Sequence, residues 1–108
     1  MASEVLKVSH SVVTDSEVVL INGASGHTYT ILSVSMCETA GNAETVDLFI
    51  QDDGGADDYE ILSDQAIGAN ETYEHTGRIV LTNEDHLTAK CASAAAVDVV
   101  VSYLDQTR

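Results

Sequence analysis

The chain has 108 residues, a length typical of one domain, with 18 Asp or Glu, 4 Lys or Arg and a formal net charge of −14. No Lys or Arg occurs between Lys7 and Arg78, and so acidic a surface repels phosphate backbones and anionic lipid heads. Nucleic acid and membrane are therefore not expected as partners. A hydrophobic fraction of 44% argues against disorder, and the absence of Trp predicts an aliphatic core.

The first half of the chain predicts strands separated by turns, because its apolar residues recur with period two. A first strand is predicted at 6–13 and a second at 17–21, and Asn22–Gly26 turns the chain into 28–36. In this third strand Leu32, Val34 and Met36 are expected to share one face, with serines opposite. The same alternation predicts a strand at 46–51, with Val46, Leu48 and Ile50 on one face. The Asp-Gly pair that follows it is typical of a hairpin.

The second half continues in the same way. Short strands are predicted at 59–62, 71–75, 78–81 and 86–92, each bounded by Gly, Asn or Asp turn residues. In a closing strand from Val97 to Leu104, the residues Val97, Val99, Val101 and Tyr103 are expected to share one face. The stretch 91–96 is rich in alanine but too short for a stable helix, so it is expected to be a loop or a single turn.

These elements predict an all-β fold, an antiparallel β-sandwich or jelly-roll-like arrangement of eight or nine short strands. We expect residues 1–108 to form a single domain, with residues 1–5 as a flexible or interface arm. The chain has no basic, apolar leader at its start, so it is expected to be made in a cytoplasm with its cysteines reduced.

No catalytic, cofactor-binding or metal-binding residue is predicted, and an enzyme is not expected. The four histidines, His10, His27, His75 and His86, lie at no spacing typical of metal ligands. There is no G-x-S-x-G motif. Neither cysteine is expected to be a nucleophile, because acidic surroundings raise a thiol pKa.

Two questions stay open at this point. Four carboxylates around two glycines, Asp52, Asp53, Asp57 and Asp58, form either a solvated hairpin tip or a site for Ca²⁺ or Mg²⁺. Cys91 continues the apolar face of the preceding strand and is expected to pack in the core. A disulfide between Cys37 and Cys91 requires that their strands face each other.

The order of strands and turns resembles the small β-sandwich virion proteins of tailed bacteriophages, which decorate or cement the head shell. The resemblance covers residues 17–105: the turn Asn22–Tyr29 into 31–37, the 46–50 strand with its hairpin, the segment 67–72, Ile79–Leu81, and the closing Val97–Leu104. It implies a late structural protein, made in the host cytoplasm, that enters the virion, binds the major capsid protein and forms a homotrimer.

The leading hypothesis is therefore a capsid decoration protein that stabilises the head shell. It is expected to contact the shell through one end of the sandwich, with the N-terminal segment reaching a neighbour. The small-residue loops 22–28 and 92–96 are expected to allow close approach of another protein. A neck, tail or fibre component of the virion is the alternative from the same class. A carbohydrate-binding module is the alternative from another class, with five aromatic candidates: Tyr29, Phe49, Tyr59, Tyr73 and Tyr103.

Overall fold

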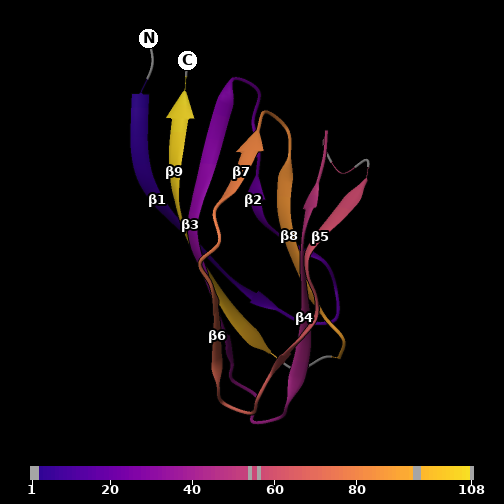
Figure 1. The fold of residues 1–108 in the computed structure, drawn as a ribbon. Coiled ribbons are helices and arrows are strands. Elements are labelled where there is room, and N and C mark those ends of the chain that lie inside the picture. The colour runs from indigo at the N-terminus through magenta and orange to yellow at the C-terminus, as the bar shows by residue number, and fades with distance from the viewer. Residues whose placement is uncertain (1–2, 54, 56, 94–95, 108) are drawn as a thin grey trace.

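A computed structural model describes residues 3–53, 55, 57–93 and 96–107. It confirms the all-β class. Nine antiparallel strands pack as a two-sheet sandwich (Figure 1). The strands are β1 (Ser3–Val13), β2 (Val18–Asn22), β3 (His27–Glu38), β4 (Glu44–Gln51), β5 (Asp58–Ile67), β6 (Thr72–His75), β7 (Ile79–Thr82), β8 (His86–Cys91) and β9 (Val97–Thr107).

The strand order is that of a jelly roll. The first sheet runs β1-β9-β3-β6, with β7 also paired to β3, and the second sheet runs β2-β8-β4-β5. The chain alternates between the sheets, so that strands adjacent in sequence are mostly not adjacent in the sheet. β6 and β7 follow each other along one side of β3, where β7 pairs with Thr28–Ile31 and β6 pairs with Val34–Cys37 (Figure 1).

One aliphatic core lies between the sheets. Val97, Val99 and Val101 of β9 are fully buried, and Tyr103 packs against the same cluster, as the alternation predicted. Val46 and Leu48 of β4 are also fully buried, with Ile50 packed against them. Burial of these apolar side chains is the main force that holds the two sheets together.

The predicted face of β3 is wrong at Leu32. The register with β9 shifts between Ile31 and Ser33, so a β-bulge inserts one residue and reverses the alternation there. Ile31 is fully buried, whereas Leu32 is 43% exposed on the outside of the first sheet. Val34 and Met36, beyond the bulge, are buried as predicted.

The expected arm at residues 1–5 is strand from Ser3 onward. Ser3 pairs with Thr107 and Val5 with Asp105, because β1 continues the ladder with β9 to the end of both strands. Residues 1–2 lie outside the described residues. Within the described chain, no helix is long and apolar enough to cross a membrane.

The two small-residue loops lie at opposite ends of the sandwich. The β2–β3 turn lies beside the paired ends of β1 and β9, at the top of Figure 1. Residues 92, 93 and 96, between β8 and β9, lie at the other end, where Ala96 accepts a backbone hydrogen bond from Thr39. A contact made through one end of the sandwich can therefore include only one of these two loops. Ala94 and Ala95 lie outside the described residues.

Candidate functional site

The outward face of the first sheet is apolar. Its outward-pointing residues include Leu6 (73% exposed), Val8 (60%) and Val80 (56%). The register places Leu6 opposite Leu104, Leu104 opposite Thr30, and Thr30 opposite Val80, so one row of side chains crosses the whole sheet. Large exposed apolar patches usually mark interaction sites. We define the apolar face as Leu6, Val8, Val12, Leu32, Val80, Val100 and Leu104.

The edge strand β1 borders this face and is open. Every residue from Ser3 to Val8 is exposed, and the β1–β9 pairing runs without a register shift. The other sheet edges are protected in familiar ways. β2 is short and bulged, β5 is bulged and carries carboxylates, and the β6–β7 edge is divided into two short strands. Among the described strands, β1 is therefore the edge best suited to contact another chain.

A buried carboxylate ties β1 to the sheet. Asp105 on β9 is 4% exposed, and its two oxygens lie 2.8 Å from Lys7 Nζ and 2.8 Å from His27 Nδ1. Burial alone would raise the pKa of Asp105, but hydrogen bonds from Lys7 and His27 outweigh it and lower the pKa. The same hydrogen bond raises the pKa of Lys7. His27 also stacks on Tyr29, with ring centroids 5.6 Å apart.

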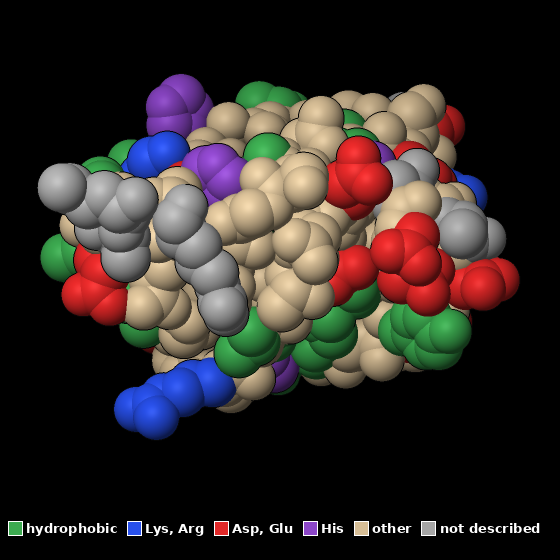
Figure 2. Space-filling model, turned by 90° about the horizontal axis from the view of Figure 1, so that it is seen from above, with side chains coloured by type: hydrophobic (Ala, Val, Ile, Leu, Met, Phe, Trp, Pro, Cys, Tyr) green, Lys and Arg blue, Asp and Glu red, His purple; other side chains and the backbone are tan. Residues whose placement is uncertain are grey.

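The end of the sandwich that carries the paired chain ends is acidic. We define the acidic end as the carboxylates of the β4–β5 and β7–β8 turns and their flanks: Asp52, Asp53, Asp57, Asp58, Glu84 and Asp85. Figure 2, which looks down on this end, shows several acidic side chains close together on one side. The histidines visible there lie mostly toward the other side.

The hydrogen bonds of the acidic end serve its turns. Asp52 Oδ1 accepts from the Asp57 backbone N–H (3.0 Å), and Asp85 Oδ2 accepts from the Thr82 N–H (3.1 Å). Asp53 has a positive φ of 46°, which fits a tight turn. Among the described residues no group of three or more His, Cys, Asp or Glu is arranged to hold a metal ion. Gly54 and Ala56, within the segment considered for Ca²⁺, lie outside the described residues.

The outward face of the second sheet is also acidic. Glu60 on β5 lies near three other carboxylates, those of Asp47, Asp58 and Asp64. Burial, followed by repulsion from these three, raises the pKa of Glu60. The sandwich is therefore polarised, with an apolar outer face on one sheet and an acidic outer face on the other.

At the opposite end, the fully buried Glu38 organises two loops. Its carboxylate accepts backbone hydrogen bonds from Ala40 (2.8 Å), Gly41 (3.0 Å), Asn42 (3.1 Å) and Asn70 (3.0 Å). The bond from Asn70 is the largest cause of a lowered Glu38 pKa, and the three others add to it against the effect of burial. A carboxylate that accepts several backbone N–H groups is held ionised. Glu38 therefore joins the β3–β4 and β5–β6 turns.

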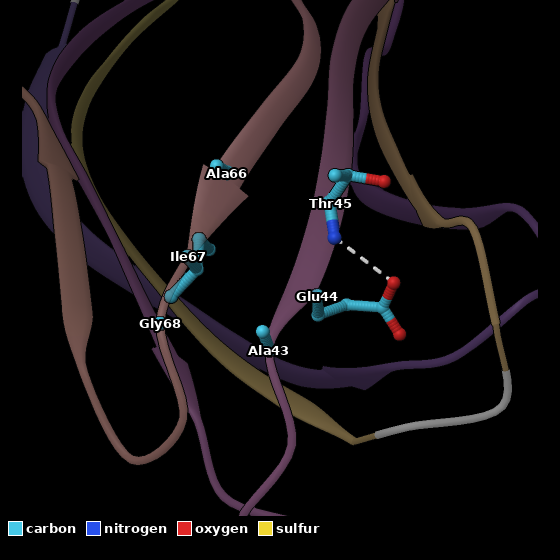
Figure 3. A pocket seen from close by; sticks show the side chains of 6 residues that line it. All are labelled: Ala43, Glu44, Thr45, Ala66, Ile67 and Gly68. Carbon is cyan, nitrogen blue, oxygen red and sulfur yellow. Dashed lines mark hydrogen bonds between the residues drawn. The ribbon is translucent and has the colours of Figure 1, made fainter.

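A cavity of about 280 Å³ lies near this end, between the start of β4 and the end of β5 (Figure 3). Glu44 is its one charged lining residue, and its carboxylate accepts hydrogen bonds from the Thr45 N–H (2.9 Å) and from Ser93 Oγ (2.5 Å). In Figure 3 the Glu44 carboxylate points away from Ile67 and Gly68 on the other wall. The Glu44 carboxylate thus binds the Thr45 backbone and Ser93 of the β8–β9 loop, and the rest of the cavity wall is mainly apolar.

The structure does not bring the histidines together, since they lie on four different strands, β1, β3, β6 and β8. Both cysteines are free. Cys91 lies in the core, as predicted, and its pKa is raised to about 11 by burial and then by Glu44, Asp47 and Glu38. Cys37 pairs with Asp98 in the ladder and lies on the outer side of the first sheet. The two strands therefore do not present these thiols to each other.

The aromatic side chains do not form a sugar-binding platform. Tyr29 and Phe49 are almost fully buried, and Tyr73 and Tyr103 pack against the core. Only Tyr59, on β5, is strongly exposed (56%). Because the chain contains no other aromatic residue, two exposed rings cannot lie side by side on its surface.

Sequence reasoning missed the residues that shape these surfaces. Asp105 and Glu38 are isolated acidic residues within strands, and the local sequence does not distinguish these buried acids from exposed acids. Leu32 lies in a regular alternation that hides the bulge. One signal was available: Leu6, Val8 and Val12 repeat on the face of β1 opposite the buried Val13.

No protein family and no curated protein matches the chain in sequence. Solved structures do share its fold. A subunit of Bacillus endospore appendages, described as disulfide-linked pili, has a TM-score of 0.59 and 11% identity, over 98% of this chain and 87% of that chain. The Drosophila NLP core, studied for pentamer formation and histone binding, has a TM-score of 0.56 and 13% identity, over 90% and 96%.

A chain from the capsid of Helicobacter pylori bacteriophage KHP30 has a TM-score of 0.53 and 13% identity, over 100% of this chain and 99% of that chain. At such identities the likeness shows the fold alone. The protein is thus a jelly-roll β-sandwich with distant structural similarity to a phage capsid protein and to an endospore appendage subunit.

Proposed function

We propose that this protein is a structural component of a phage virion, a capsid decoration protein that binds and stabilises the head shell. The observation that carries the proposal is the end-to-end match of the jelly roll to a chain of a phage capsid, which covers 100% of this chain and 99% of that one. A decoration protein acts through its surface, and many copies on one shell gain avidity even when each contact is weak.

The acidic end is the part of the surface that we propose to dock on the shell. Its carboxylates and the overall charge of −14 favour a basic partner, because complementary charge speeds association and orients the partners. The paired ends of β1 and β9 lie at the same end and would meet the same partner. The partner that we propose is the major capsid protein.

Co-sedimentation with undecorated shells tests the proposal. Wild-type protein should pellet with shells at a fixed ratio to capsid subunits, and less at high salt. The double variant Asp52→Asn/Asp53→Asn should bind more weakly. Asn keeps the hydrogen-bonding shape of Asp and tolerates the positive φ at position 53. The control is Asp15→Asn/Glu71→Gln, which removes the same charge at the other end. Equal binding by both variants would reject docking through the acidic end, and no pelleting of the wild type would reject the decoration role.

A second candidate is a fibre or appendage subunit, in the virion or on a cell. It is favoured by the similarity to the Bacillus endospore appendage subunit, with a TM-score of 0.59. Electron microscopy of the purified protein distinguishes the two candidates. Filaments that grow without shells would favour the appendage, and small discrete particles would favour the decoration protein. The buried aromatic rings give no support to a carbohydrate-binding module.

A further inference from the structure

The apolar face has the size of a protein interface. The first sheet is four strands wide where β7 or β6 lies beside β3, and β1 and β9 are 11 residues long. At about 4.8 Å between strands and about 3.4 Å per residue, its outer face covers roughly 19 by 37 Å, or about 700 Å². Specific complexes bury about 600–1,000 Å² on each partner. The face is therefore large enough for a stable contact between two chains.

Most of its polar residues are small, and the exception at the centre of β1 is His10, which lies opposite Val100. Between the apolar side chains lie Thr30, Ser33, Ser35 and Ser102, whose short hydroxyl side chains leave the surface flat. Two shallow depressions run along the β1–β9 border, one of about 360 Å³ lined in part by Leu6 and Leu32, the other of about 260 Å³ beside Val12 and Val100. A partner can approach the backbone closely along this border.

The charge distribution favours a second copy of this chain as the partner. Among the described residues, the charged side chains that point outward from the first sheet are Glu4, Glu74 and Asp98, while Lys7 turns to Asp105. The outer face of the second sheet has the carboxylate group around Glu60, and the acidic end has its own. In a chain of net charge −14, the apolar face is thus a surface on which two copies can meet while most carboxylates stay far apart.

We infer that the apolar face is the surface through which copies of this chain associate with one another. The association buries Leu6, Leu32, Val80 and their neighbours, and leaves the acidic end free. A small closed oligomer follows if the packing has rotational symmetry. The inference rests on the proposed function, which leads us to expect a homo-oligomer. The two can be rejected independently, because self-association is measured in the absence of capsid shells.

Analytical ultracentrifugation of the purified chain tests the inference. The wild type should sediment as an oligomer, and added salt should strengthen the association because it screens the repulsion between acidic copies. Leu6→Lys and Val80→Lys should each shift the protein toward monomer. Tyr59→Lys is the matched control, since Tyr59 and Val80 are both 56% exposed but lie on different sheets. Circular dichroism establishes that each variant is folded.

Thiol labelling gives an independent measurement. Cys37 lies on the outer side of the first sheet and Cys91 is buried, so the labelling rate of the native protein reports on Cys37. The Cys37 rate should fall as protein concentration rises, and the Val80→Lys variant should lose this protection. A wild type that stays monomeric at all concentrations would overturn the inference. So would an oligomer that persists in both lysine variants, or one that Tyr59→Lys disrupts equally.

Discussion

The bulge in β3 places two neighbouring residues, Ile31 and Leu32, in opposite environments. Ile31 is fully buried and Leu32 is 43% exposed, although an unbroken alternation with Val34 would place them the other way round. Substituting either residue by alanine removes three carbon atoms, so the chemistry of the two changes is matched. The difference in unfolding free energy then reports only the surroundings of each side chain.

The magnitudes follow from burial. Three carbon atoms at about 0.8 kcal/mol each give about 2.4 kcal/mol of lost transfer free energy for a buried site. The residual cavity brings the cost of Ile31→Ala to about 4 kcal/mol, within the range for such changes. For Leu32→Ala the transfer part scales down with exposure, and no enclosed cavity forms, so we expect about 1 kcal/mol. For a chain of this size these costs correspond to losses in Tm of roughly 20 °C and 5 °C.

Urea and thermal unfolding, followed by circular dichroism, provide the measurement. They are run at low protein concentration, because Leu32 belongs to the apolar face and its loss also weakens association. If Ile31→Ala does not fold, Ile31→Val replaces it, with an expected cost of about 1 kcal/mol. A cost of Leu32→Ala above about 2.4 kcal/mol, the transfer free energy for a buried site, would refute the bulge and restore the unbroken alternation.

Three further outcomes are expected. Asp105→Asn should destabilise the protein at neutral pH, whereas Asp98→Asn, at an exposed position, should not. Because the folded pKa of Asp105 is lowered, the difference in Tm between Asp105→Asn and wild type should close as pH falls below about 4. A difference in Tm that does not change with pH would contradict the ion pairs. Glu38→Gln should speed hydrogen exchange at the backbone amides of Ala40, Gly41 and Asn70, which donate to the Glu38 carboxylate. Unchanged exchange at these amides would show that the two turns are stable without the carboxylate. Because the folded pKa of Glu60 is raised, Glu60→Gln should raise Tm at neutral pH. This benefit should disappear in acid and shrink in high salt, which screens the repulsion but not the effect of burial; a lowered Tm would contradict the repulsion.

Most of the fold could be predicted from the sequence, because strand and turn signals are local. Every predicted strand overlaps one in the structure, and the faces of β4 and β9 were predicted correctly from alternation alone. Strand ends were predicted less well, since β1, β5 and β9 extend beyond their apolar runs into polar residues, which the apolar alternation does not mark. The sheet order depends on long-range pairing, which no local pattern records.

The surfaces were harder to predict for the same reason. Leu6 and Val80 are far apart in the chain and share a row only because β9 and β3 lie between them. Asp105 meets Lys7 and His27 through the same pairing. An isolated acid or valine in a strand carries no sign of which strand will lie beside it. The bulge at Leu32 was hidden because a bulge changes the register without changing the composition.

The pairing of Ser3 with Thr107 has a practical consequence for protein engineering. A peptide fused before Ser3 and one fused after Thr107 would emerge side by side at the acidic end, so exchanging one attachment point for the other would not change the position of the cargo. If the acidic end faces the capsid shell, a peptide fused at either terminus would lie between the protein and the shell. A foreign epitope would be better inserted at the distal β3–β4 turn, beside the exposed Gly41, which is itself kept because its φ of 83° strains any other residue. The amide bonds of that turn to Glu38 would then limit how long the insert can be.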